Sequence, residues 1–303
     1  MAHNLRYAAA SDVGRRREQN EDSAYASPRV LAVADGMGGY AHGEVASSVA
    51  ITAIAALDDS VHESGPGVDL QDAMRSVVKQ INHTLGEMAE EDPGLRGMGT
   101  TLTAMLWEGR RFALAHIGDS RAYLLRDGAL YQITHDHTLV QTLVDDGRIT
   151  PEQASVHPRR SMLLRVLEGT GDGDPDVRVR EGEPGDRYLL CSDGLTAVLG
   201  PETLHDVLTR MAEPEAAVAR LIELANEGGG PDNISCVVAD LIDIGEARVP
   251  PVPGSSSERP RSERGEPRAA PARRGSRAAS CQVTWVPAPG GLPAHASTAG
   301  REG

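Results

Sequence analysis

The chain has 303 residues, of which 40% are hydrophobic and only 3% aromatic, so its core must be built mainly from aliphatic side chains. Its formal net charge of −14 disfavours binding to nucleic acid and to anionic membrane surfaces. Lys79 is the only lysine, so the sequence contains no Gly-Lys-Ser/Thr phosphate-binding loop. An acidic chain of this kind would need cations to handle phosphate.

Cysteine usage and hydropathy bear on the location of the chain. The three cysteines (Cys191, Cys236 and Cys281) are odd in number and widely spaced, which favours reduced thiols over a disulfide framework. The N-terminus lacks the apolar stretch of a signal peptide, and no run approaches the length of a membrane span. We therefore expect a cytoplasmic protein that makes no contact with a membrane.

Hydrophobic periodicity predicts a mixed α and β domain. Apolar positions at helical spacing predict helices from Val45 to Leu57 and from Leu70 to Met88. Further helices are expected near 137–147, 201–212 and 214–227. Short apolar or alternating runs predict strands at 5–10, 30–34, 101–107, 112–117, 121–126, 129–133, 186–191 and 234–241.

Tight connections join several of the expected strands. Glu108-Gly109-Arg110 and Asp127-Gly128 are typical of hairpins, and hairpins imply antiparallel pairing. Strands that follow one another without intervening helices argue against a doubly wound parallel sheet. The pattern predicts an α+β fold.

The composition changes at Glu246, after which Pro, Arg, Ser, Gly and Ala dominate. This stretch contains nine arginines and five glutamates, a charge of +4, which leaves −18 for residues 1–245 because the total is −14. A segment with so little apolar surface cannot offset its chain entropy. We expect residues 1–245 to form one domain and residues 246–303 a disordered tail; a basic docking or autoregulatory segment is the alternative.

Aspartates recur where expected strands end. Asp35-Gly36, Asp119 and Asp193-Gly194 follow apolar runs, and Asp232-Asn233 precedes one. Each pair alone is an ordinary turn former. Asp35 is followed by four glycines within eight positions, which is too glycine-rich for a simple hairpin. Carboxylates that converge repel one another unless cations neutralise them, and oxygen ligands with few His or Cys nearby select Mg²⁺ or Mn²⁺.

Six short motifs occur in one order along residues 5–242. They are Arg17-Glu-Gln-Asn-Glu21-Asp22, Val33-Ala-Asp35-Gly36-Met37-Gly38-Gly39, Gly99-Thr100-Thr101, Gly118-Asp119-Ser120-Arg121, Ser192-Asp193-Gly194 and Gly230-Pro231-Asp232-Asn233. In this set the chain resembles the bacterial type 2C (PPM) metal-dependent Ser/Thr protein phosphatases. The resemblance implies a four-layer α-β-β-α sandwich of two antiparallel sheets flanked by helices, with metals in a cleft at one edge.

The resemblance also implies a set of metal ligands. Asp35 would bridge two Mn²⁺ or Mg²⁺ ions, Gly36 would offer its carbonyl, and Asp193 and Asp232 would complete the shell of one ion. Glu21 would reach the other ion, with Asp22 supporting it from behind. Asp119 would hold a third, more weakly bound ion together with Asp193. The site residues carried over in this way are Arg17, Glu21, Asp22, Asp35, Gly36, Asp119, Asp193, Asp232 and Asn233.

The implied reaction is hydrolysis of phosphoserine or phosphothreonine by in-line attack of a metal-bridging hydroxide. Arg17, Asp35 and Asp193 would be the catalytic residues, Arg17 by gripping the phosphate. Met37 stands where many eukaryotic relatives have a histidine proposed as general acid. A metal-bound water must then protonate the leaving oxygen, or His42 must reach in from its loop. Residues 136–168 match the variable flap of the family, which would tune substrate choice.

Three other functions fit the sequence less well. A cysteine phosphatase needs an arginine six positions after its cysteine, and none of the three cysteines has one. His135-Asp136 fits a histidine-aspartate phosphohydrolase poorly, because it follows a strand and lies in an expected loop. A non-catalytic module of the same fold would be favoured by loss of a metal ligand, and none is lost. The expected partners are phosphorylated Ser/Thr proteins, including kinases, and the expected state is a monomer.

Overall fold

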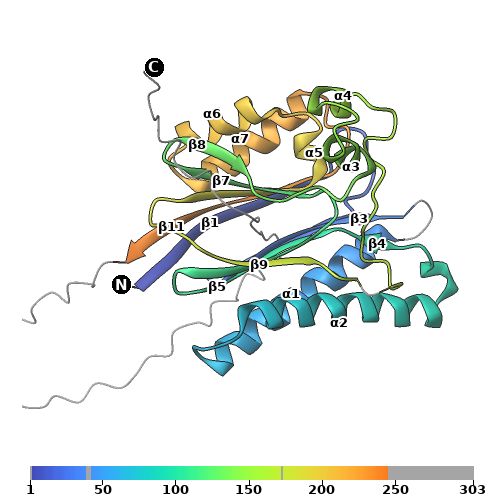
Figure 1. Ribbon diagram of the computed structural model, residues 1–303, viewed down its shortest axis with the longest axis horizontal. Helices are drawn as coiled ribbons and strands as arrows, with labels where there is room; N and C mark the ends of the chain where they lie inside the picture. The colour runs from blue at the N-terminus through green and yellow to red at the C-terminus, as the bar shows by residue number, and fades with distance from the viewer. Residues whose placement is uncertain (1, 39–41, 172, 245–303) are drawn as a thin grey trace, which may run out of the picture.

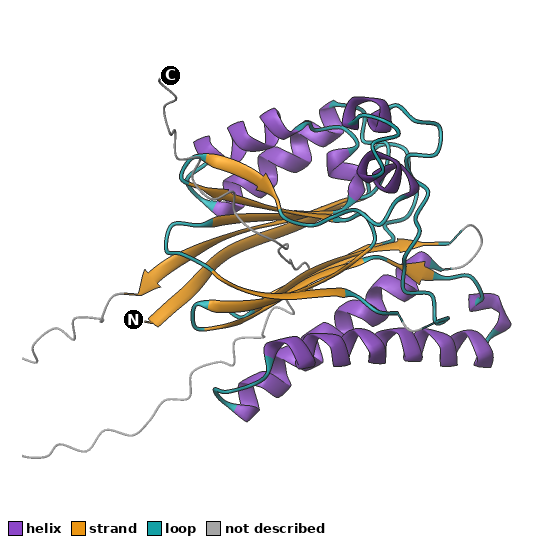
Figure 2. Ribbon diagram, in the orientation of Figure 1, coloured by secondary structure: helices purple, strands orange, loops and turns teal. Residues whose placement is uncertain are grey.

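The computed structural model describes residues 2–38, 42–171 and 173–244, which form two packed sheets covered by helices on both outer faces (Figures 1 and 2). Within these ranges no helix combines the length and the apolar character that crossing a membrane requires. The expected tail, residues 246–303, and Cys281 within it lie outside the described residues. The expected α+β sandwich of two antiparallel sheets is confirmed.

The first sheet has the strand order β1-β11-β10-β7-β8, and every pair in it is antiparallel. Its strands are β1 (Ala2–Asp12), β7 (Arg121–Arg126), β8 (Ala129–Gln132), β10 (Arg187–Cys191) and β11 (Ile234–Ile244). The β7–β8 hairpin turns at Asp127 and Gly128, both at positive φ (51° and 75°), as a two-residue hairpin of this hand requires. The hairpin predicted at Asp127-Gly128 is therefore confirmed.

The second sheet has the order β2-β3-β5-β6-β9 and is also antiparallel. Its strands are β2 (Asp22–Ala26), β3 (Val30–Met37), β5 (Leu102–Glu108), β6 (Arg111–Ile117) and β9 (Asp176–Glu181), with the short β4 (Gly99–Thr100) paired to β3. Strands β2, β4 and β9 were not predicted. The chain passes from β6 in this sheet to β7 in the other, so the strands between 101 and 133 do not form one meander.

Helices cover the outer face of each sheet (Figure 1). The predicted helices α1 (Gly43–Ser64) and α2 (Leu70–Glu91) lie on the second sheet, and Asp69 caps α2 by accepting from the Gln71 and Asp72 backbone at 3.0 and 3.1 Å. Helices α6 (Pro201–Arg210) and α7 (Pro214–Glu227), predicted near 201–212 and 214–227, lie on the first sheet. The part of the chain that the structure describes also contains the short helices η1 (Pro93–Leu95), α3 (Leu139–Asp145), α4 (Pro151–Ser155) and α5 (Asp193–Thr196).

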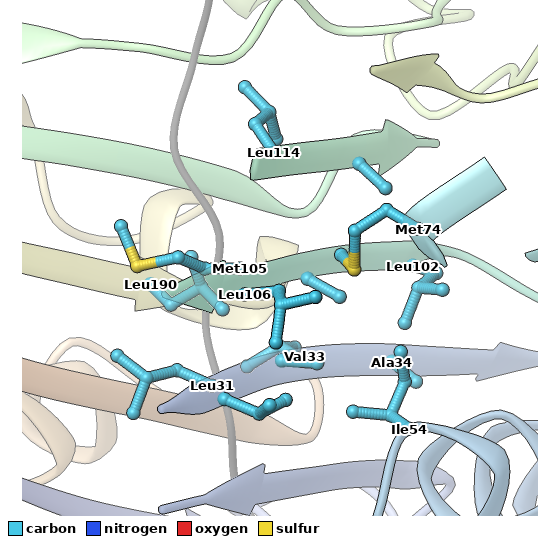
Figure 3. Close-up of a cluster of buried hydrophobic side chains, with 14 of the residues drawn as sticks. Leu31, Val33, Ala34, Ile54, Met74, Leu102, Met105, Leu106, Leu114 and Leu190 are labelled. Atoms are coloured by element: carbon cyan, nitrogen blue, oxygen red, sulfur yellow. The ribbon is translucent and has the colours of Figure 1, made fainter. Parts of the chain in front are cut away.

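The core is aliphatic, as the composition predicts. Figure 3 shows Leu31 and Met105, which pair across β3 and β5, beside Leu190 of the first sheet, and Leu102 beside Ile54 of α1 and Met74 of α2. A second cluster lies between the first sheet and α6 and α7. The buried aromatics Trp107, Phe112 and Tyr188 pack on one another with centroids 4.5–6.0 Å apart, and so serve the core rather than a binding surface.

Candidate metal centre

Two aspartates face each other on the second sheet. Asp22 opens β2, and it pairs in register with Asp35 near the end of β3. The Asp35 backbone is fixed by the next strand, because its N–H donates to Thr101 Oγ1 (3.1 Å) and its carbonyl accepts from the Thr101 N–H (2.9 Å) and from Thr100 Oγ1 (3.0 Å). The motif Gly99-Thr100-Thr101 thus anchors the residue predicted to bridge two ions.

The first sheet brings two more aspartates to the same edge. Asp193 begins α5 directly after β10, and Asp232 precedes β11, which pairs with β10. A Cβ on Gly194 would lie 1.9 Å from the Asn233 carbonyl oxygen, so glycine is required for these segments to approach. Asn233 accepts from the Glu21 N–H (2.9 Å) and donates to the Val13 and Gln19 carbonyls (3.0 and 2.8 Å), which holds the segment that carries Arg17 and Glu21.

Glu21 and Gly36 meet the N-terminus of α1. The Gly36 N–H donates to the Glu21 carbonyl (3.1 Å), and Ser47 Oγ donates to the same carbonyl at 2.6 Å. A Cβ on Gly36 would lie 2.1 Å from the Gly43 carbonyl oxygen, and one on Gly43 would lie 2.9 Å from Glu21 Oε2. The glycines of this motif therefore allow the backbone to close around the Glu21 carboxylate.

Burial and mutual repulsion raise the pKa values of these carboxyl groups. Burial raises the pKa of Asp22 to about 7 even though a hydrogen bond from Ser192 lowers it. Burial and then the charge of Asp193 raise the pKa of Asp119 to about 7. Burial and the charge of Asp22 raise the pKa of Asp35 well above its usual range, and burial and the charge of Asp232 raise that of Asp193. Their interactions show that these groups share one electrostatic environment.

Arg17 is the arginine of the run Arg15-Arg16-Arg17 that contacts this site. Its Nη2 donates to Asp232 Oδ2 at 2.7 Å, and 47% of its side chain remains exposed. The charges of Glu21 and Asp35 also act on it. Arg17 therefore lies beside these carboxylates and stays half-exposed, so its guanidinium can meet an incoming anion.

The donor set is suited to hard divalent cations. The carboxylates and the Gly36 carbonyl are oxygen donors. The pKa values of the carboxyl groups are raised by burial and then by mutual repulsion, and a bound cation would offset both. Among residues 2–38, 42–171 and 173–244, no three His, Cys, Asp or Glu side chains are gathered closely enough to enclose an ion as they stand. Arg17 meanwhile supplies the positive charge beside Asp232.

The protein phosphatase 2C family model matches residues 15–226. The chain belongs to the protein phosphatase 2C family. It is 53% identical over 248 residues to the serine/threonine protein phosphatase PstP of Mycobacterium tuberculosis, an alignment that covers 82% of this chain and 47% of that protein. The chain thus spans about half the length of this curated relative.

Other members of the protein phosphatase 2C family align over a similar share of this chain, and their solved structures have the same fold. The serine/threonine phosphatase stp of Listeria welshimeri is 34% identical over 235 residues, which cover 76% of this chain and 93% of the relative. The catalytic domain of PstP, whose crystal structure is a complex with two manganese ions, is 52% identical with a TM-score of 0.74, and covers 80% of this chain and 100% of that one. The family resemblance expected from the six motifs is confirmed.

Two residues at the start of the expected flap, residues 136–168, are buried and support the residues around Asp119. Asp136 accepts from Arg121 through both oxygens at 2.6–3.0 Å and is 6% exposed, while His137 is 8% exposed and binds Gly118 beside Asp119. Ser192 is a further support that the sequence pattern does not predict, and its hydroxyl donates to the Asp22 carboxylate at 2.7 Å. The sequence offers one indication of the Arg121–Asp136 ion pair, which is that Arg121 belongs to the motif Gly118-Asp119-Ser120-Arg121.

Proposed function

We propose that this chain is a metal-dependent protein serine/threonine phosphatase that hydrolyses phosphoserine and phosphothreonine. One observation supports this above the others. Carboxylates from both sheets share one electrostatic environment at one edge of the sandwich, with raised pKa values and a half-exposed arginine beside them. Such a cluster favours binding of divalent cations, and the arginine favours binding of a phosphate dianion.

The six sequence motifs contain the proposed metal ligands. Asp35, the Gly36 carbonyl, Asp193 and Asp232 would hold one of two Mn²⁺ or Mg²⁺ ions, and Asp35 with Glu21 the other. Asp119 and Asp193 would hold a third, weaker ion. When bound, these ions would activate water for attack and neutralise charge on the phosphate.

The protein's own side chains bind and orient the substrate. Arg17 has five N–H donors, and one of them donates to Asp232, so the others can donate to phosphate oxygens. Met37 carries no acidic proton, and exposed His42 pairs with Glu44 at 3.0 Å. We therefore propose that water protonates the leaving serine or threonine oxygen.

We propose that residues 1–245 are the catalytic domain and 246–303 a tail without catalytic residues. Phosphorylated proteins, among them Ser/Thr kinases, are the proposed substrates, and a cytoplasmic monomer the proposed state. The net charge of −14 supports protein substrates rather than nucleic acid.

The test is release of phosphate from a phosphothreonine peptide, with Mn²⁺ and with a chelator. We expect Mn²⁺-dependent turnover that the chelator abolishes, and a loss of at least about a hundredfold for Asp193→Asn, because a charged ligand is removed. Cys191→Ala is the matched control, since Cys191 is buried two residues away in β10 and has no proposed role. Absence of turnover at every Mn²⁺ concentration, or equal losses in both variants, would contradict the proposal.

A further inference from the structure

The link Gly118-Asp119-Ser120 joins the two sheets, because β6 ends at Ile117 in one sheet and β7 begins at Arg121 in the other. Asp119 is therefore placed by its two neighbours rather than by a continuous strand ladder. Ser120 is held by Thr101, whose Oγ1 lies 2.9 Å from Ser120 Oγ, and by Thr103 Oγ1, which donates to the Ser120 carbonyl at 3.0 Å. One side of Asp119 is thus fixed to β5 and its N-terminal neighbour Thr101.

The other side of Asp119 is held by His137. The His137 N–H donates to the Gly118 carbonyl at 2.8 Å, and the Gly118 N–H donates to His137 Nδ1 at 3.1 Å. Gly118 has φ +113°, and a Cβ there would lie 2.5 Å from Thr101 side-chain atoms, so the link has no other residue type available at this position. The N–H and the carbonyl of Gly118, the residue before Asp119, therefore both hydrogen-bond to His137.

His137 also stands at the base of the flap, residues 136–168. Its carbonyl accepts from the Leu164 N–H at 2.8 Å, and the next residue, Thr138, forms a β-bridge with Leu163. The far nitrogen of its ring, Nε2, lies 2.7 Å from Arg165 Nη1 and 3.7 Å from Asp176 Oδ2. The ring thus lies between the link Gly118-Asp119-Ser120 and the segment that leads from the flap to β9.

A neutral imidazole has a single acceptor nitrogen, and here two donors face the ring. The Gly118 amide can only donate, so its bond requires the lone pair on Nδ1 and the proton on Nε2. The Nε2–H then faces Asp176, whose pKa lies below its usual range because of His137 and Arg165. The opposite tautomer would accept from Arg165 and would turn an N–H toward the Gly118 amide. The neutral ring can therefore accept a hydrogen bond from Gly118 or from Arg165, but not from both.

We propose that His137 is a positioning residue for Asp119, and that the flap acts on the weakest cation position through this ring. The proposal rests on the proposed function, in which Asp119 and Asp193 share that cation. The charge of Asp193 acts on Asp119, so a shift of the link changes the distance between two carboxylates that must bind one ion together. His137 contacts neither substrate nor cation and acts through Gly118.

The test is calorimetric titration of the metal-free full chain with Mn²⁺. His137→Asn keeps an acceptor where Nδ1 lies, and His137→Gln keeps a polar group where Nε2 lies but loses the acceptor for Gly118. We expect His137→Gln to weaken the weakest Mn²⁺ step about tenfold, since a buried N–H is left unpaired. Asp119→Asn should weaken the same step, while His137→Asn should leave both that step and the tighter steps unchanged.

Asp176→Asn provides a second test that leaves His137 in place. It removes the carboxylate that favours the proton on Nε2, so we expect a weakening of the same step by about threefold. Should His137→Gln fail to fold, this variant decides the question, because Asp176 is 30% exposed. Its unfolding curve, measured alongside, verifies that the titrated chain is folded.

The outcomes separate this inference from the proposed function. Unchanged Mn²⁺ binding in folded His137→Gln, or in Asp176→Asn where that variant decides, would overturn the role of His137. Equal losses in His137→Gln and His137→Asn would also overturn it, because both would then reflect a merely structural role. A wild-type chain that binds no Mn²⁺ would overturn the proposed function itself, and this inference with it.

Discussion

The Ser192 hydroxyl donates a 2.7 Å hydrogen bond to the Asp22 carboxylate, and this bond crosses from one sheet of the sandwich to the other. The same hydroxyl accepts from the Ser235 N–H at 3.0 Å. Asp22 faces Asp35 across β2 and β3, and Ser192 precedes Asp193. Ser192 therefore ties the half of the site on the first sheet to the half on the second.

Ser192→Ala should destabilise the fold and weaken cation binding together. The substitution leaves the buried Ser235 N–H unpaired and removes the bond that lowers the pKa of Asp22, so we expect a loss of about 1–3 kcal/mol in the free energy of unfolding. Urea unfolding and Mn²⁺ calorimetry would measure both effects. Ser155→Ala, at an exposed hydroxyl bonded to the Glu152 carbonyl, is the matched control and should change stability by less than about 0.5 kcal/mol.

Stability without divalent cations should fall as the pH rises. The pKa values of Asp22 and Asp119 are about 7 in the folded chain and near 4 when unfolded, so the folded state holds extra protons between these values. Stability that depends on those protons is present below about pH 4 and is lost through pH 7. In a chelator each of the two groups should cost about 2 kcal/mol between pH 5.5 and 8, the equivalent of a Tm drop of about 4–8 °C per group.

Added Mn²⁺ should reverse this trend, because cations bind the deprotonated carboxylates of the folded chain. Asp22→Asn in chelator should flatten the dependence, since one of the titrating groups is gone. Thermal melts at several pH values, with and without Mn²⁺, provide the measurement. A Tm that rises between pH 5.5 and 8 in chelator would show that these carboxyl groups titrate normally.

Gly36→Ala should be strongly destabilising. A Cβ at this position would lie 2.1 Å from the Gly43 carbonyl oxygen and 2.5 Å from that of Glu21, and both are backbone atoms that must move. We expect a loss of about 3 kcal/mol, measured by urea unfolding, together with weaker Mn²⁺ binding. Gly200→Ala is the control, because a Cβ there meets nothing within 4 Å and its φ is −73°. Similar losses in both variants would refute the close-approach argument.

Arg17→Lys should impair phosphopeptide turnover with little effect on folding. Lysine retains the charge but loses the planar fork that can bind two phosphate oxygens, so we expect the KM for a phosphothreonine peptide to rise about tenfold. Because Arg17 is 47% exposed, its contribution to stability is small. Arg16→Lys, at the neighbouring exposed arginine, should leave KM unchanged. Equal effects at both positions would mean that the run acts only by its overall charge.

The elements that the sequence could predict are those with long, regular patterns. Helices α1 and α2 keep apolar spacing over several turns, and hydrophobic burial dominates their placement. Strand β9 was missed although Val177 and Val179 alternate with arginines, because the run is short and follows a Gly- and Asp-rich segment. Strand β2 was missed because it opens on Asp22, a residue buried for the site rather than for packing.

The sequence by itself determined the family, the α+β class and the oxygen-donor chemistry, because motif order and residue type are properties of the chain. The tertiary structure decided which groups meet. Arg17 reaches Asp232 across 215 positions, Ser192 reaches Asp22 across 170, and His137 reaches Gly118 across 19. Spacing along the chain carries no information about such contacts, because they form only when the two sheets pack and bring their edges together.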